Sequence, residues 1–300
     1  MWHHFAMPRR LALSLDAVIV AVTAGRPRIL TATPTPGGMP ALPSGPLDAD
    51  DDATLELGLR RWISAQTGLA VGYVEQLYTF GDRDRQRVAQ ATRLLSIAYL
   101  GLVKEAQPAT GAAWLDAYDL LPWEDRRAGL PAIVGEELLP ALTRWAGRDT
   151  ARRHRVRANF GDPSSWDPVR VLERFELLYQ AELVPEFRRD RGQRPSAGQA
   201  AGIELDNDHR RIVATALGRL RGKLKYRPVV FELLPETFTL LQLQRTVEAL
   251  TGMRLHKQNF RRLVENGRFL EATRGLEKAA RGRPAKLFRF RKEVVRARLY

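Results

Sequence analysis

Apolar positions in the first 145 residues repeat with the periods of strands and of helices in turn. An unbroken apolar run from Ala17 to Val22 is typical of a buried strand, and a turn at 25–27 leads to a second short run. Leu55, Leu59 and Ile63 then recur at helical spacing before Gly68, which stands where a helix C-cap belongs. The pattern predicts a hairpin over 11–30, a helix over 55–67 and strands over 73–80 and 94–103.

The middle of the chain is predicted to be helical and to end in a linker. Helical patterns occur at 136–145 and 169–187, and a loop at 161–168 that contains Pro, Gly and Ser separates them. The stretch 189–202 is polar and contains Gly and Pro, as linkers commonly do. These changes of pattern divide the chain into predicted domains over 1–145, 146–205 and 206–300.

The last domain is predicted to contain three helices followed by a strand hairpin. Apolar residues lie on one face of 208–224, and Thr239 opens a capping-box pattern for a second helix that ends at Gly252. A third helix is expected at 256–266. Alternating strands are expected at 268–273 and 286–291, around a loop of Gly, Arg and Pro. This order of elements is that of a winged helix-turn-helix.

Positive charge is concentrated at the same end of the chain. The protein has 300 residues and a formal net charge of +14. Residues 206–300 contain 23 Lys and Arg against 9 Asp and Glu, whereas the first 205 residues contain 25 of each kind. The C-terminal domain is therefore the part of the chain that is suited to a polyanion.

The third helix of this domain has the composition of a DNA recognition helix. Phe260, Leu263 and Val264 are expected to form its buried side, which leaves polar side chains for the DNA. Gln and Arg can make paired hydrogen bonds to adenine and guanine. The predicted DNA-binding residues, with those of the following hairpin, are His256, Lys257, Gln258, Asn259, Arg261, Arg262, Arg281, Arg283, Lys286 and Arg289.

The hairpin is expected to act as a wing that grips the DNA backbone or the minor groove. Phe288 and Phe290 alternate with Arg289 and Arg291, so aromatic and basic side chains point to opposite faces. A basic amphipathic helix is often only a solvated surface. The local positive charge, the capping and turn residues of a helix-turn-helix and the basic hairpin occur together, and this combination favours DNA binding.

Several runs along the chain are similar to those of a known family of proteins. They lie at 220–226, 231–235, 238–240, 243–244, 259–262 and 282–290 in the last domain, and at 75–82 and 96–100 in the first half. The runs of the last domain resemble the NrtR family, Nudix-related transcriptional regulators of NAD metabolism. The N-terminal half resembles the Nudix-fold part of the same family, and the long helical stretch between the halves is similar to the NadQ-like branch. The resemblance implies an α+β fold: an N-terminal Nudix-like α/β/α sandwich with a helical extension, followed by a C-terminal winged helix-turn-helix.

The resemblance also implies a function. We expect a homodimeric repressor of NAD biosynthesis genes that binds double-stranded operator DNA and responds to a nucleotide effector, namely ADP-ribose, NAD or ATP. The aromatic members of the expected effector site lie in predicted strands, where core packing is the alternative interpretation. The predicted effector-binding residues are Arg61, Tyr78, Phe80, Arg87 and Tyr99.

The first domain lacks the glutamates of an active Nudix hydrolase. Such an enzyme needs several glutamates on one helix face to hold divalent ions, and Trp62, Ala65 and Gln66 occupy those positions here. We therefore predict no enzyme activity, no catalytic residue, no metal and no cofactor. The rival interpretation is a Nudix-type hydrolase of nucleoside diphosphate derivatives with an accessory nucleic-acid-binding domain. Clustered acids at 48–52 offer a rival metal site, although such acids commonly complement a helix N-terminus.

Composition narrows the remaining possibilities. The chain has no cysteine, which fits a reducing compartment, and no apolar stretch approaches the length of a membrane span, so we expect a cytoplasmic protein with no membrane contact. The histidines show no metal-ligand spacing, and His209 is expected to pack or cap. A sequence-independent binder of DNA or RNA is the second rival to a regulator.

Overall fold

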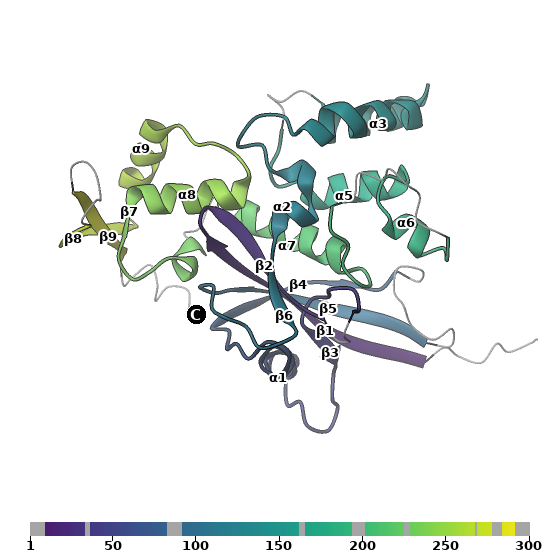
Figure 1. Cartoon of the computed structure of the whole chain (residues 1–300), viewed down its shortest axis with the longest axis horizontal. Helices are drawn as coiled ribbons and strands as arrows, with labels where there is room; N and C mark the ends of the chain where they lie inside the picture. Colours follow the sequence, from purple (N-terminus) through teal and green to yellow (C-terminus); the bar gives the residue numbers. More distant parts are fainter. Residues whose placement is uncertain are drawn as a thin grey trace, which may run out of the picture.

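A six-stranded sheet forms the centre of the molecule, and a three-stranded sheet lies at one end (Figure 1). The computed structural model describes residues 10–33, 37–82, 92–161, 166–193, 202–224, 229–267, 269–277 and 284–291. Helices lie on both faces of the large sheet and extend to one side of it (Figure 1).

The large sheet has the strand order β4-β5-β1-β2-β6, and β3 pairs with β1. Its strands are β1 (Arg10–Thr23), β2 (Arg26–Ala32), β3 (Ser44–Pro46), β4 (Tyr73–Phe80), β5 (Thr92–Leu102) and β6 (Ala112–Asp116). β1 and β5 are parallel, and the other pairs are antiparallel. The predicted hairpin and the strands at 73–80 and 94–103 are confirmed, whereas β6 has no counterpart among the predicted elements.

The hairpin turn lies earlier than its predicted position at 25–27. Ala24 and Gly25 both have positive φ, 51° and 73°, and Thr23 pairs with Arg26 across the turn. A two-residue turn with two positive φ angles matches the twist of the strands that it joins, whereas Pro27 could not adopt such a φ.

Both faces of the sheet are covered, which explains the unbroken apolar run in β1. Ala17 and Ile19 face α1 (Leu55–Thr67), together with Leu59 and Ile63 of that helix. Val18 and Val20 point to the opposite face, where they join a core that includes α7 (His209–Leu224). A strand covered on both faces needs apolar residues at every position, so the sheet and its two helical layers form the predicted sandwich.

A helical segment follows the sheet, and its later helices lie in the insertion predicted over 146–205. Its elements are α2 (Ala117–Leu120), a 3-10 turn (Pro122–Glu124), a π-helical turn (Val134–Leu138) that continues into α3 (Leu139–Ala146), α4 (Thr150–Phe160), α5 (Val171–Gln180) and α6 (Glu186–Arg189). The predicted helix at 136–145 is confirmed. α4 was not among the predicted helices.

The prediction of one helix over 169–187 is wrong, because the chain breaks between α5 and α6. Glu182 has a positive φ of 62°, and Val184 is completely buried in the break. Pro185 cannot donate the backbone hydrogen bond that a helix interior requires. The break therefore brings Val184 into the core, and a second short helix starts after Pro185.

The C-terminal domain has the predicted order of helices and strands. It contains α7, a 3-10 turn (Val229–Leu233), β7 (Phe238–Thr239), α8 (Leu240–Thr251), α9 (Lys257–Gly267), β8 (Leu270–Glu277) and β9 (Ala285–Phe290). One apolar core runs from the sheet through α5 and α7 into α8 and α9. The boundary near residue 205 stays a prediction, and α7, just after it, packs against α5 and the large sheet.

Candidate DNA interface and effector domain

Helix α8 is the scaffold of the candidate DNA interface, and both of its ends follow the predicted pattern. The N–H of Gln242 donates to Oγ1 of Thr239 (3.2 Å), and the N–H of Thr239 donates to Oε1 of Gln242 (2.7 Å), which confirms the capping box. Gly252 ends the helix with a φ of 68°. A Cβ at this position would lie 2.3 Å from the carbonyl oxygen of Glu124, so the close approach of two segments also requires glycine.

Helix α9 exposes the polar side chains that were predicted to contact DNA. Phe260 is buried and attaches the helix to the core. Within the described ranges, the other side chains make no hydrogen bond or ion pair with one another or with their neighbours, so they are free to meet a partner. The exposed residues are His256, Lys257, Gln258, Asn259, Arg261 and Arg262.

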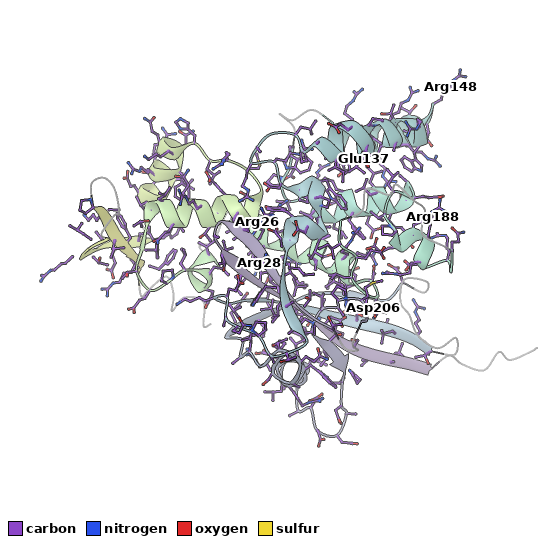
Figure 2. The ribbon with its side chains drawn as sticks, in the orientation of Figure 1. Arg26, Arg28, Glu137, Arg148, Arg188 and Asp206 are labelled. Carbon is purple, nitrogen blue, oxygen red and sulfur yellow. The ribbon has the colours of Figure 1, made fainter. Side chains whose placement is uncertain are left out.

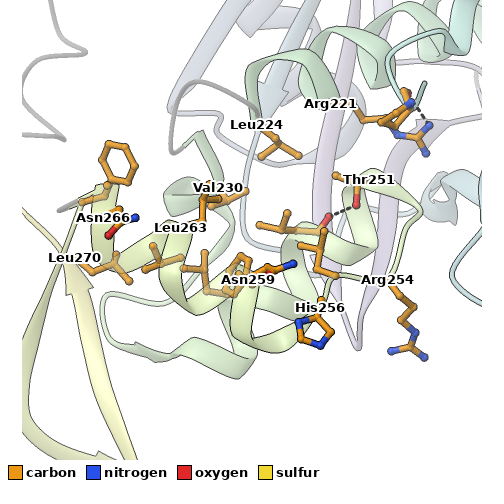
Figure 3. Close-up of a pocket in the computed structure, with 18 of the residues that line it drawn as sticks. Arg221, Leu224, Val230, Thr251, Arg254, His256, Asn259, Leu263, Asn266 and Leu270 are labelled. Carbon is orange, nitrogen blue, oxygen red and sulfur yellow. Dashed lines mark hydrogen bonds between the residues drawn. The ribbon is translucent and has the colours of Figure 1, made fainter. Parts of the chain in front are cut away.

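The prediction that Leu263 is buried is wrong, since 68% of it is exposed. Leu263 borders an apolar hollow of about 740 Å³ between α9 and the C-terminal end of α7, where Leu224, Val230 and Leu270 also lie (Figure 3). Val264 is only partly buried beside it. The helix therefore rests mainly on Phe260, and its apolar face is narrower than its sequence indicates.

The three-stranded sheet forms the wing. Phe288 and Phe290 pack against the core, and the ring of Phe290 lies 5.0 Å from that of Phe238 in β7. Arg289 and Arg291 are exposed on the other face, as predicted, and Arg289 pairs with Glu271 of β8. Lys286 is exposed, whereas the predicted tip residues Arg281 and Arg283 lie outside the described residues.

Two of the residues that replace the Nudix glutamates fasten α1 to strand β3. Gln66 accepts a hydrogen bond from the N–H of Ser44 (3.0 Å) and donates one to its carbonyl oxygen (2.7 Å). Nε1 of Trp62 donates to the carbonyl oxygen of Pro46 (2.9 Å). A Cβ on Gly45 would lie 2.1 Å from the Trp62 ring, so the ring occupies the space beside β3. Gln66 and Trp62 therefore hold β3 in place, and neither offers a carboxylate to a metal ion.

The acidic cluster at 48–52 also makes internal contacts. Asp48 accepts hydrogen bonds from the N–H groups of Asp50 and Asp51, and Asp52 accepts one from that of Asp48. Arg61 donates two hydrogen bonds to Asp52 (2.8 and 3.0 Å), which lower the pKa of that carboxyl group. These contacts shape the loop. Among the described residues, no group of three or more His, Cys, Asp or Glu is arranged to hold a metal ion.

The predicted effector residues do not form one cluster. Phe80 is buried in the core on the α7 face of the sheet, and Tyr99 is buried on the opposite face, under α1. Tyr78 is 62% exposed and packs edge-on against Phe80. Arg61 lies on α1 and is held by Asp52, and Arg87 lies outside the described residues. For Phe80 and Tyr99, core packing accounts for the aromatic ring.

A fully buried ion cluster joins the first domain, the insertion and the winged helix. Glu124 pairs with Arg174 of α5 (2.5 and 2.8 Å) and with Arg221 of α7, and none of the three side chains is exposed. Nε of Arg221 donates to the carbonyl oxygen of Leu250 in α8 (2.8 Å). The Tyr118 hydroxyl donates to the carbonyl oxygen of Ala249 (2.6 Å) in the same turn. Both contacts lie at the end of α8 that leads into α9.

Electrostatics stabilise this cluster in its charged form. Burial by itself would raise the pKa of Glu124, but the charges of Arg174 and Arg221 and their hydrogen bonds hold that pKa below its ordinary value. Burial raises the pKa of Tyr118 to about 12, so its hydroxyl remains a donor. The sequence analysis did not single out these residues. One signal was available, because Arg221 lies on the same helix face as Leu217 and Leu224.

His209 has a packing role, as expected. It is buried at the start of α7, and the N–H of Leu42 donates to its Nδ1 (3.0 Å). Its Nε2 lies 3.8 Å from Asp16 of β1. The histidine therefore ties α7 to the sheet. In the part of the chain that is described, no helix is both long and apolar enough to span a membrane.

Comparisons with known proteins agree with this architecture. Residues 230–290 match the NrtR DNA-binding winged helix domain. The chain is 32% identical over 130 residues to the ADPR responsive transcriptional repressor NtrR of Acinetobacter baylyi, an alignment that covers 43% of this chain and 51% of that protein. The chain thus spans about half the length of this curated relative.

Two solved structures share the fold over almost the whole chain. One is the Shewanella oneidensis NrtR complexed with a 27mer DNA, which is 21% identical to this chain with a TM-score of 0.57. The match covers 95% of each chain. A MutT/nudix family protein from Enterococcus faecalis is 16% identical with a TM-score of 0.54, covering 97% of this chain and 89% of that one. The predicted fold class and the resemblance to the NrtR family are confirmed, and the NadQ-like branch stays a prediction.

Proposed function

We propose that this chain, whose residues 230–290 are an NrtR-type winged helix domain, is a transcriptional repressor that binds operator DNA and is controlled by a nucleotide. Its targets are proposed to be genes of NAD biosynthesis, and its working form a homodimer with two winged helices on two half-sites. ADP-ribose is the first effector to test, because the curated relative is described as ADPR responsive.

The exposed polar face of α9 is the observation that carries the proposal. Gln258 and Arg262 are exposed, have no partner among the described residues, and are of the types that read adenine and guanine in the major groove. The capped helix α8 and the buried Phe260 hold α9 in a defined orientation. Lys286 and Arg289 of the wing supply contacts to the backbone.

The Nudix-like domain is proposed to bind its nucleotide without hydrolysing it. Trp62, Ala65 and Gln66 replace the glutamates that would hold the divalent ions, and Trp62 and Gln66 make hydrogen bonds to β3. The effector site is proposed at the level of the domain, since its predicted residues are divided between two faces of the sheet. Mg²⁺-dependent turnover of ADP-ribose that is lost on substitution in this domain would favour the hydrolase instead.

The buried cluster around Glu124 is the proposed route between effector and DNA. It links the 3-10 turn at 122–124, α5 and α7 to the carbonyl groups at the end of α8, which is the helix that positions α9. A displacement in the first domain would therefore reach the recognition helix through buried contacts. Coupling between two such sites typically amounts to about 1–3 kcal/mol.

The test is fluorescence anisotropy of operator-like DNA from a promoter of NAD biosynthesis genes, with scrambled DNA of equal length as control. We expect tight binding that depends on sequence and is shifted by ADP-ribose, NAD or ATP. Binding that ignores both the sequence and every nucleotide would overturn the proposal. Tyr118→Phe then tests the route, because it keeps the ring but removes the hydrogen bond to the carbonyl oxygen of Ala249 and the longer one that the hydroxyl accepts from Arg221 (3.4 Å). We expect a smaller nucleotide-induced shift with operator affinity retained.

A further inference from the structure

The helical hairpin formed by α3 and α4 carries a basic surface that lies apart from the winged helix. Residues 139–161 contain six arginines against a single acidic residue, Asp149. The whole segment 1–205 has no net charge, so this local excess is hidden in the overall composition. The arginines are Arg144, Arg148, Arg152, Arg153, Arg155 and Arg157.

Three of these arginines are available to a partner. Arg144, Arg148 and Arg157 are exposed, and none of them makes an ion pair or side-chain hydrogen bond with another described residue. Arg152 lies 3.5 Å from Asp149 and stacks on Trp145, and Arg155 donates to Gln180. The surface therefore combines fixed arginines with free ones.

The helix that carries most of these arginines is well anchored. α4 starts at Asp149, whose side chain accepts a hydrogen bond from the N–H of Arg152 (3.0 Å). Val156, Asn159 and Phe160 are its buried residues, and they face the core shared with α3 and α5. A helix that buries so few residues leaves most of its circumference to solvent, so its shape is preserved while its arginines remain accessible.

The position of the hairpin relates it to the DNA interface. α9 and α3 both lie along the upper edge of the molecule, with the large sheet below them (Figure 1). Arg148 projects from the outer end of α3 at this edge (Figure 2). A duplex held by α9 would continue past the operator half-site. Once the chain is bound, the phosphates that flank the operator are the polyanion nearest to the arginines of α3 and α4.

We propose that Arg144, Arg148 and Arg157 form a second DNA contact that grips the phosphate backbone beside the operator. This inference rests on the proposed function of the winged helix, which supplies the first contact. Arginine pairs with phosphate through parallel hydrogen bonds and reads no sequence, so the second contact adds affinity only where the DNA is long enough to reach it.

The experiment compares two duplexes that share one operator, a short one that ends at the operator and a longer one with random flanks on both sides. We expect the full chain to bind the longer duplex more tightly. Arg148→Glu combined with Arg157→Glu should remove that advantage and leave affinity for the short duplex unchanged. The logarithm of the association constant falls as the logarithm of the salt concentration rises. Loss of two phosphate contacts should make this slope less steep by about 1.8 on the longer duplex.

The controls separate this proposal from the proposed function. Arg219→Glu reverses an exposed arginine on α7 and should leave the length advantage intact. Arg148→Lys combined with Arg157→Lys keeps the positive charge at both positions and should preserve most of the length advantage. A length advantage that survives the double Glu variant would overturn the second contact. Absence of sequence-dependent binding to the short duplex would overturn the regulator itself.

Discussion

Glu124 and Arg221 are 97 positions apart in the sequence, yet they form an ion pair in which neither side chain is exposed to solvent. Arg174 completes the cluster from α5. Two buried guanidinium groups thus share one buried carboxylate. This arrangement couples three parts of the chain that the sequence presents as separate segments.

Replacement of Glu124 by Ala should destabilise the protein strongly. The change leaves Arg174 and Arg221 buried without a counter-charge, and the removal of one partner from a buried pair typically costs about 3–5 kcal/mol. Denaturant unfolding would measure the loss. The matched control is Glu56→Gln, which breaks an exposed pair with Arg60 on α1 and should cost less than about 0.5 kcal/mol. Equal losses from the two variants would contradict the assigned role of the cluster.

Substitutions on α9 and on the wing should have different effects on DNA binding. Gln258→Ala and Arg262→Ala should reduce the preference for the operator over scrambled DNA, because each side chain is exposed where it can meet base edges. Lys286→Ala should weaken binding to all sequences alike and reduce the salt slope by about 1. Anisotropy titrations at several salt concentrations distinguish the two patterns. If both α9 variants retained full specificity, α9 would not be the recognition helix.

Substitution of Gly45 by Ala should disturb strand β3 where it faces α1. The added methyl group would lie 2.1 Å from the Trp62 ring, and overpacking of this kind typically costs about 1–3 kcal/mol. Thermal unfolding would detect the loss. The same substitution combined with Trp62→Ala should cost less than the sum of the two single changes, because the clash is then removed. Additive losses would show that Trp62 does not determine the need for glycine.

Stability should fall in mild acid in a way that depends on His209. Burial lowers the pKa of this imidazole against the opposing charges of Asp16 and Asp206, with Arg189 adding to the decrease. The unfolded chain therefore binds a proton that the folded chain resists, so the free energy of unfolding should decrease as the pH falls below about 6.5. Unfolding curves between pH 7.5 and 5.5 would show a steeper decrease for the natural protein than for His209→Gln.

Local patterns accounted for most of the elements. The capping box of Thr239 and the C-cap at Gly252 were predictable because each depends on a few neighbouring residues. The break between α5 and α6 had a local signal in Pro185, which cannot donate a backbone hydrogen bond inside a helix. The burial of Val184 in that break could not be predicted, because it depends on a core built from distant segments. The polar face of α9 was predicted correctly, but the exposure of Leu263 depends on how the helix lies against α7 and α8.

The sequence by itself determined the winged helix and its charge, the absence of Nudix glutamates at Trp62, Ala65 and Gln66, and the likeness to a known family of regulators. These properties depend only on residue type and on spacing along the chain, so they can be determined without knowledge of the fold. Only the tertiary structure decided that Phe80 and Tyr99 lie in two different cores and that Glu124 holds Arg174 and Arg221. Burial and charge pairing depend on which distant segments meet, and that is settled when the chain folds.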